Sequence, residues 1–321
     1  MVPSMSSRGW AVVLAFVVLA ACGDGGPSAG SGPDDPAKVS VVAAFLPIAE
    51  AAEAIGSDRV QVLNLTPVGA GPHSIELGGK VLDDVSRSDV VFYLSNGFQP
   101  AVQKLVDGLP GGVRAVDLLP TELLPVDEAL PGVEGEVDGE VLSGGKDPHV
   151  WMDPLRFKAM AERIRDVLID VDPDGAKSFE DNAARYTAQL DSLDGAFREG
   201  LERCESRVVV TSHRAFGYLT DRYGLRQVPI AGISPDEEPN AKSIAAVAAE
   251  ARREKVTVVF FESLVPKKLA DTVAQEVGAA TDALNPVEGL TAEEVDAGID
   301  YMSIQRENLA ALRKGLRCGG G

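Results

Sequence analysis

The stretch Ala176–Cys204, AKSFEDNAARYTAQLDSLDGAFREGLERC, decides how the rest of the chain is organised. Its apolar residues recur at helical spacing, so it predicts one helix of about 29 residues. At 1.5 Å per residue such a helix is roughly 40 Å long, enough to cross a whole domain. It therefore predicts a rigid strut with a separate lobe of the protein on either side.

The chain before this helix alternates between β-branched runs and stretches with helical spacing. The predicted strands are Val39–Phe45, Val60–Thr66, Val90–Leu94 and Arg114–Asp117. The predicted helices are Pro47–Ile55, Ser74–Ser86, Phe98–Val106 and Pro154–Ile169. Such an alternation predicts a mainly parallel sheet with helices on both faces.

The same alternation resumes after the long helix. The predicted strands are Arg207–Thr211, Gln227–Ile230, Val256–Phe261 and Thr281–Leu284. The predicted helices are Ala215–Tyr223, Lys242–Glu254, Lys267–Val277 and Ala292–Leu316. The sequence therefore predicts an α/β fold of two lobes with mainly parallel sheets, joined by a long rigid backbone helix. We expect the first lobe at 38–173, the linking helix at 174–205 and the second lobe at 206–321.

Residues 119–147 interrupt the alternation with a segment rich in Pro, Gly, Glu and Asp, which predicts a long exposed loop. Loops of this length in compact proteins are usually functional or without fixed structure. Four of its carboxylates could gather cations: Glu134, Glu136, Asp138 and Glu140. An ordinary solvated acidic loop is the simpler interpretation.

The N-terminus has the features of a secretory signal. Arg8 supplies a positive charge, and Trp10–Ala20 is an apolar run that is too short to span a bilayer as a helix. The run ends in Leu19-Ala20-Ala21-Cys22, which resembles the bacterial lipobox. We expect residues 1–21 to be a signal peptide, Cys22 to be lipidated, and 22–37 to form a flexible tether. A plain cleaved signal with a coincidental cysteine is the alternative.

Composition excludes one class of partner. The chain has 321 residues, of which 45% are hydrophobic and 25% charged, as in globular proteins. Its formal net charge is −19, and no Lys/Arg stripe is present to neutralise phosphates, so we expect no nucleic-acid partner.

Two cysteines remain besides Cys22, namely Cys204 and Cys318. In an exported protein an even pair favours a disulfide, which here would tie the chain terminus to the segment entering the second lobe. Two unpaired thiols are the alternative.

The chain has only three histidines, His73, His149 and His213, and each lies in a predicted loop. His73 follows the strand Val60–Thr66, and His213 comes two residues after the strand Arg207–Thr211. In open α/β sheets, ligands bind at the carboxyl ends of the strands. Three converging imidazoles would suit Zn²⁺, which takes a fourth ligand to complete a tetrahedron. The alternative is three unrelated histidines at loop ends.

Four segments resemble the zinc/manganese-binding receptor family of bacterial ABC importers. They are GPHSIE (71–76), DPHVWMDP (147–154), VTSHRAFGY (210–218) and ISPDEEP (233–239). The resemblance implies a metal held between two α/β lobes, with His73 and His149 from the first lobe and His213 from the second. It also implies a monomeric receptor, not an enzyme, that is lipid-anchored to the outer face of the cell membrane and delivers its ion to an importer permease.

The fourth ligand is open. The family usually places an Asp in an Asp-Pro turn after the last strand, where this chain has Leu284–Glu288, LNPVE. The candidates are Asn285, a water molecule, or Glu262, which follows the strand Val256–Phe261. Each residue also has an ordinary explanation, because Asn285 suits a turn before proline and Glu262 suits a helix N-terminus.

Three histidines favour Zn²⁺, whereas relatives that bind Mn²⁺ tend to use two histidines and two carboxylates, so Mn²⁺ is the alternative cargo. A zinc hydrolase would need a general base, for which only Glu262 could be nominated, and the sequence contains no HExxH, GxSxG or Walker A motif. A surface adhesin with a structural metal is the other alternative. Structural zinc usually uses cysteines close in sequence, whereas these histidines span about 140 residues.

Overall fold

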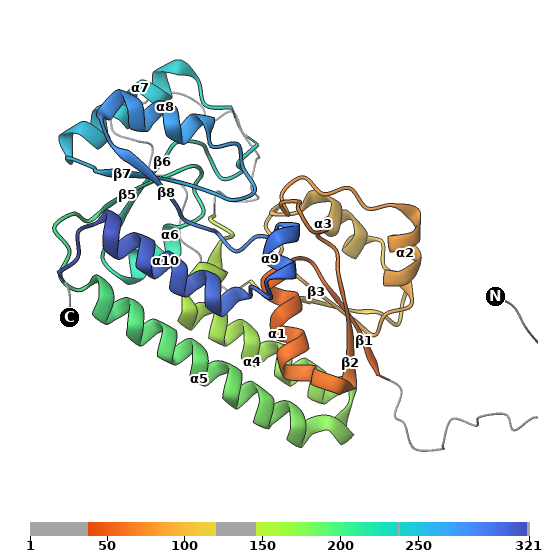
Figure 1. Cartoon of the computed structure of the whole chain (residues 1–321). Helices are drawn as coiled ribbons and strands as arrows, with labels where there is room; N and C mark the ends of the chain where they lie inside the picture. Colours follow the sequence, from red (N-terminus) through yellow and green to blue (C-terminus); the bar gives the residue numbers. More distant parts are fainter. Residues whose placement is uncertain (1–37, 120–145, 237, 320–321) are drawn as a thin grey trace, which may run out of the picture. The chain divides into compact units, whose positions relative to one another are not determined.

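The computed structural model describes residues 38–119, 146–236 and 238–319 (Figure 1). These residues belong to one unit that runs from Ala37 to Gly321. The predicted signal peptide, Cys22, the tether and nearly all of the acidic loop lie outside the described residues.

The first sheet contains four parallel strands in the order β2-β1-β3-β4. Its strands are β1 (Val39–Ala43), β2 (Val60–Asn64), β3 (Val90–Tyr93) and β4 (Arg114–Asp117). The helices of this lobe are α1 (Leu46–Gly56), α2 (Gly79–Ser86) and α3 (Pro100–Asp107). Strand β1 reads VSVVA and is almost wholly buried, as expected for a central parallel strand covered on both faces.

The second sheet repeats this arrangement, with the order β6-β5-β7-β8. Its strands are β5 (Val208–Thr211), β6 (Arg226–Pro229), β7 (Val258–Phe261) and β8 (Ala280–Ala283). Its helices are α6 (Gly217–Arg222), α7 (Ala241–Arg253) and α8 (Lys268–Val277). An apolar cluster fills the space between this sheet and helices α7 and α8. The predicted α/β fold with two parallel-sheet lobes is confirmed.

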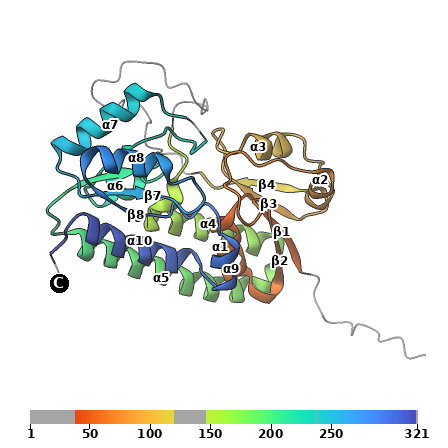
Figure 2. The same ribbon diagram turned by 45° about the horizontal axis from the view of Figure 1, so that its top comes forward.

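Long helices connect the two lobes. They are α4 (Pro154–Val171), α5 (Ala176–Leu201) and α10 (Tyr301–Gly315). Helix α5 packs against α4 and α1 of the first lobe and against α10, which lies along the second sheet (Figures 1 and 2). Gly315 allows the close approach of α10 to that sheet, because a Cβ atom there would lie 2.6 Å from the ring of Phe260. Helix α5 therefore runs beneath both lobes, as its sequence predicted.

Two predicted helices differ from the structure. The stretch Ala292–Leu316 is two helices, α9 (Ala292–Asp296) and α10, because Gly298 has a positive φ of 68° and Asp300 caps a new helix. The helix predicted at Ser74–Ser86 begins only at Gly79. Single 3₁₀ turns occur at Ser57–Arg59, Val150–Met152 and Pro173–Gly175.

The predicted disulfide between Cys204 and Cys318 is present, and it ties the chain after α10 to the end of α5. Hydrogen bonds extend this junction, since the backbone N–H of Gly319 donates to the carbonyl oxygen of Arg203 at 2.7 Å. Within the described part of the chain, no helix combines the length and apolar content required to cross a membrane.

Candidate metal site

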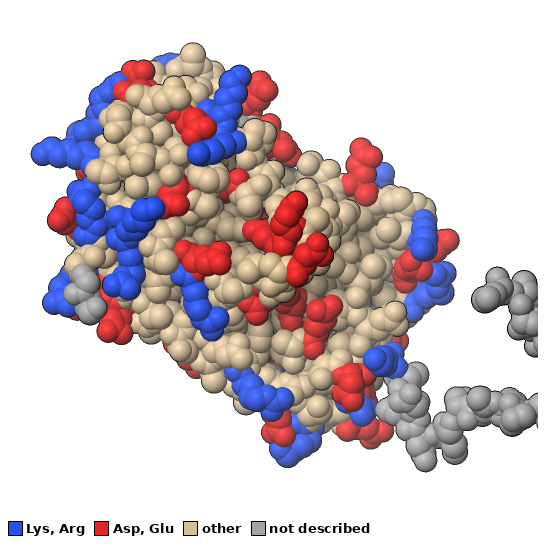
Figure 3. All heavy atoms as spheres, in the orientation of Figure 1, with Lys and Arg blue, Asp and Glu red and all other residues tan. Residues whose placement is uncertain are grey.

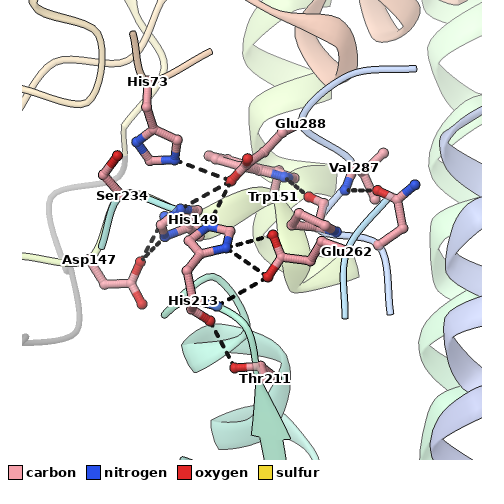
Figure 4. Close-up of polar contacts among 12 residues, drawn as sticks. His73, Asp147, His149, Trp151, Thr211, His213, Ser234, Glu262, Val287 and Glu288 are labelled. Carbon is pink, nitrogen blue, oxygen red and sulfur yellow. Dashed lines mark hydrogen bonds and ion pairs between the residues drawn. The ribbon is translucent and has the colours of Figure 1, made fainter. Parts of the chain in front are cut away.

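The structure brings the three histidines together (Figure 4). His73 lies in the loop after β2, and His213 lies two residues after the end of β5. His149 directly precedes the 3₁₀ turn that leads into α4. Their ring centroids are 5.4–5.8 Å apart, and their exposed fractions are 6%, 0% and 0% for His73, His149 and His213. Two parallel sheets place their carboxyl ends around one point, as this class of fold does for ligands in general.

Glu288 completes the cluster from the segment after β8. Its Oε1 atom lies 3.3 Å from Nε2 of His73, 3.3 Å from Nε2 of His149 and 3.2 Å from Nε2 of His213. The four candidate ligand atoms all lie within 4.8 Å of one another. Tetrahedral zinc with bonds of about 2.0–2.1 Å requires ligand atoms about 3.3–3.4 Å apart. The three distances from Glu288 to the imidazoles match this edge, and three nitrogens with one carboxylate oxygen are a donor set that zinc takes.

Two carboxylates contact the Nδ1 atoms of His213 and His149, opposite the Nε2 atoms that face Glu288. The Nδ1 atom of His213 lies 2.8 and 2.7 Å from the two oxygens of Glu262, and the backbone N–H of His213 donates to the same group. On the other side, Nδ1 and the backbone N–H of His149 both donate to Oδ1 of Asp147, at 2.8 and 2.9 Å. A carboxylate on Nδ1 fixes the tautomer that leaves Nε2 free to bind a metal.

The second lobe holds the backbone of Asp147 and leaves room for its carboxylate. The hydroxyl of Tyr218 donates to the Asp147 carbonyl oxygen at 2.7 Å. Gly217 leaves room for the carboxylate, because a Cβ atom there would lie 2.5 Å from Oδ2 of Asp147. The first-lobe ligand His149 is therefore positioned partly by helix α6 of the second lobe.

The charges of the cluster are strongly coupled. Burial alone would lower the pKa of His213, but the carboxylates of Glu262 and Glu288 outweigh it and raise the pKa to about 10. Burial alone would raise the pKa of Glu288, but the neighbouring imidazoles, His213 and His73 first, hold it well below its ordinary value. Without a metal, the site therefore holds a proton on His213 opposite an ionised Glu288.

Asn285 and Glu262, the residues named from sequence as possible fourth ligands, do not face the Nε2 atoms. The amide nitrogen of Asn285 donates to the hydroxyl of Ser263 at 3.1 Å, and its amide oxygen accepts from the backbone N–H of Val287 at 2.8 Å. The Glu262 carboxylate contacts Nδ1 of His213, on the side of the ring away from Nε2. The predicted turn supplies the carboxylate, but three residues later, at Glu288.

Glu288 was not among the candidates from the sequence, which were Asn285, a water molecule and Glu262. The available signal was that Glu288 is the only carboxylate in Leu284–Glu288, the turn where the family usually places its fourth ligand. A cavity of about 100 Å³ adjoins the cluster. Its lining includes His73, Glu262 and Glu288, so this cavity borders the proposed ligands.

The sequence and the structure are similar to those of known zinc-uptake proteins. Residues 41–315 match the family model described as zinc-uptake complex component A, periplasmic (ZnuA). The high-affinity zinc uptake system protein ZnuA of Bacillus subtilis is 35% identical over 310 residues, which cover 95% of this chain and 96% of that protein. The crystal structure of the Zn(II)-bound ZnuA-like domain of Streptococcus pneumoniae AdcA has 36% identity and a TM-score of 0.72, covering 87% of this chain and 99% of that domain.

A third similar structure is the laminin-binding protein Lmb of Streptococcus agalactiae, described as a bifunctional protein with adhesin and metal transporting activity. It has 25% identity and a TM-score of 0.74, covering 87% of this chain and 99% of that protein. The family match spans nearly all described residues, including the three histidines and Glu288. The chain belongs to the family of periplasmic zinc-uptake components, ZnuA.

Proposed function

We propose that this protein is an extracytoplasmic receptor that captures Zn²⁺ between its lobes and delivers it to an ABC importer in the membrane. The ligands in this proposal are His73, His149, His213 and Glu288. The observation that carries it is the distance of 3.2–3.3 Å from one Glu288 oxygen to all three imidazole Nε2 atoms, which is the ligand spacing of tetrahedral zinc.

The donor chemistry supports Zn²⁺ over Mn²⁺. Three imidazole nitrogens and one carboxylate oxygen suit zinc, whereas Mn²⁺ favours sets richer in oxygen. The relatives described above carry zinc in their names. Mn²⁺ is the alternative cargo, and a competition titration with both ions separates the two.

The division of ligands between the lobes supports capture followed by release. The first lobe supplies His73 and His149, and the second supplies His213 and Glu288. A small tilt of one lobe would leave each half with only two ligands, which weakens zinc without unfolding either lobe. Because α5 packs beneath both lobes, we propose small tilts of the lobes rather than wide hinge closure.

The surface suits cation capture at a membrane. Figure 3 shows Asp and Glu side chains over the middle of one face, where α9 lies, with Lys and Arg mainly toward its edges. An acidic face raises the local concentration of cations. From the lipobox-like sequence before Cys22, we propose that the protein is exported and anchored to the outer face of the cell membrane. We also propose that it acts as a monomer, because each chain supplies all four proposed ligands. Loss of membrane association in Cys22→Ser tests the anchor.

Catalysis and adhesion are not part of the proposal. Glu262, the residue that could serve as a general base, contacts His213 with both of its oxygens. An adhesin role has no specific support in this chain beyond the likeness to Lmb. Reversible zinc binding by a protein that stays folded without metal separates a receptor from a protein with a structural metal.

The test is elemental analysis of protein purified without chelator, followed by competitive titration against a zinc chelator. His213→Ala and Glu288→Ala each remove a proposed ligand and should weaken zinc on the order of 100-fold or more. Glu276→Ala, which changes an exposed carboxylate on α8, is the control and should bind as the unmodified protein does. Unchanged zinc affinity in both ligand variants would refute the proposed site.

A further inference from the structure

The turn that carries Glu288 is held in an unfavourable backbone conformation. Val287, directly before Glu288, has a positive φ of 58° and is completely buried. The other positive-φ residues besides glycine in the described ranges are Ser57, Asn96, Lys255 and Arg317, which are not β-branched. A β-branched residue in this region is a true outlier, because its side chain crowds the backbone. The turn therefore persists only because its surroundings hold it.

Several hydrogen bonds hold the turn from the second half of the chain. The backbone N–H of Asn285 donates to Oδ1 of Asn308 on α10 at 2.8 Å, and Nδ2 of Asn308 donates to the Asn285 carbonyl oxygen at 2.7 Å. The N–H of Val287 donates to the Asn285 side chain. These bonds hold the backbone at Asn285 and Val287. They leave the Pro286 carbonyl oxygen, which lies two residues before Glu288, to accept a hydrogen bond from another part of the chain.

That partner is Trp151, from the same segment of the first lobe as His149. Its indole Nε1–H donates to the Pro286 carbonyl oxygen at 2.8 Å (Figure 4). Trp151 is completely buried, and its ring lies 4.6 Å from Phe45 and 5.2 Å from the ring of His149. The indole is thus fixed in place by the first lobe before it reaches the turn.

We infer that Trp151 is a positioning residue, which clamps the strained turn so that Glu288 faces the imidazoles. The inference rests on the proposed function, because it needs Glu288 to be a zinc ligand. Without the indole N–H, the Pro286 carbonyl is buried without this bond and the turn is free to relax from the Val287 conformation. Glu288 then leaves the point shared by the three Nε2 atoms. The indole N–H of Trp151 acts on zinc through Glu288, because its partner is the turn that carries Glu288.

A double-mutant cycle tests this dependence. Trp151→Phe keeps an aromatic ring and removes the N–H, so zinc affinity should fall about tenfold. In a Glu288→Ala background the same substitution should change affinity by less than about twofold, because the residue through which it acts is gone. A residue that only supports packing would weaken zinc equally in both backgrounds.

Two further variants guard against misfolding. The benzothienyl analogue of tryptophan at position 151 keeps the bicyclic shape but has no N–H, and it should behave as Trp151→Phe does. Tyr223→Phe removes a buried hydrogen bond of 3.2 Å to Asp194 on α5, which contacts neither Trp151 nor the turn, so it should leave zinc affinity unchanged. Thermal unfolding without metal identifies any variant that is not folded.

Equal losses in both backgrounds, or no loss in the benzothienyl variant, would overturn the role of Trp151 while leaving the zinc site intact. If Glu288→Ala itself bound zinc as the unmodified protein does, the proposed ligand set would fail, and the role of Trp151 with it. The two failures are therefore distinguishable.

Discussion

Replacing Glu262 by glutamine should weaken zinc binding at alkaline pH and flatten its dependence on pH. The carboxylate lies 2.7–2.8 Å from Nδ1 of His213 on the side away from the ligand atoms. Glu262→Gln preserves the size of the side chain but removes its charge. The amide can also donate to Nδ1, which favours the tautomer whose Nε2 carries a proton and cannot bind a metal.

The magnitude follows from two opposing effects. Loss of an orienting carboxylate typically weakens a metal site 10–100-fold, about 1.4–2.8 kcal/mol. The pKa of His213 is about 10 in the metal-free protein, so zinc must displace a proton at neutral pH. The affinity of the unmodified protein should therefore rise about tenfold per pH unit between pH 7 and 9. In Glu262→Gln the pKa falls, because burial lowers it and Glu288 alone opposes this, so the slope flattens.

Chelator competition at pH 7, 8 and 9 measures both quantities. Proton competition weakens zinc binding by the unmodified protein about tenfold at pH 9 and about 1,000-fold at pH 7. The variant should therefore bind zinc up to about tenfold more weakly at pH 9, and this deficit should vanish or reverse at pH 7. Glu250→Gln is the matched control, since Glu250 is a buried carboxylate on α7 that pairs with Arg226 at 2.7 Å. The same slope and the same affinity at pH 9 in Glu262→Gln and the unmodified protein would refute the role assigned to Glu262.

Three further outcomes are expected. Gly217→Ala should weaken zinc by about tenfold in chelator competition, since its Cβ would displace the Asp147 carboxylate that orients His149; unchanged affinity would contradict this. Removing the disulfide with Cys204→Ser and Cys318→Ser should lower the free energy of unfolding by about 2–4 kcal/mol in denaturant titrations, with zinc affinity retained. Burial raises the pKa of Glu50 to about 7 from 4.5, so the folded state keeps a proton that the unfolded chain loses, and stability falls as pH rises through this window. Glu50→Gln should therefore stabilise metal-free protein by about 3 kcal/mol at pH 8 and by much less at pH 5, as thermal unfolding would show.

The position of Glu50 makes the last outcome informative about the fold as well as about pH. Its carboxylate accepts from the backbone N–H of Tyr301, at the start of α10, at 2.7 Å. The contact between helix α1 and helix α10 thus includes the Glu50 carboxyl, whose pKa is raised to about 7. Glutamine can accept the same bond without the charge, so the variant isolates the contribution of ionisation.

Local patterns were sufficient for much of this protein. The alternation of β-branched runs with helical spacing predicted both parallel sheets, because a strand buried on both faces needs continuous apolar residues whatever its neighbours are. The position of His213 two residues after a strand predicted that it lies near the carboxyl end of the sheet, because the ends of parallel strands lie on one edge of a sheet. The pairing of Cys204 with Cys318 followed from their number in a chain that was expected to be exported.

Tertiary structure alone decided the fourth corner of the site and the residues behind it. Glu288 reaches the imidazoles because Val287 adopts a left-handed conformation that its own side chain disfavours, and contacts from Trp151 and Asn308 hold it there. Those partners lie 135 residues before Pro286 and 23 residues after Asn285, so no local pattern encodes them. Periodicity in a sequence reports which face of an element is buried, whereas the direction of one side chain in a strained turn depends on distant parts of the chain.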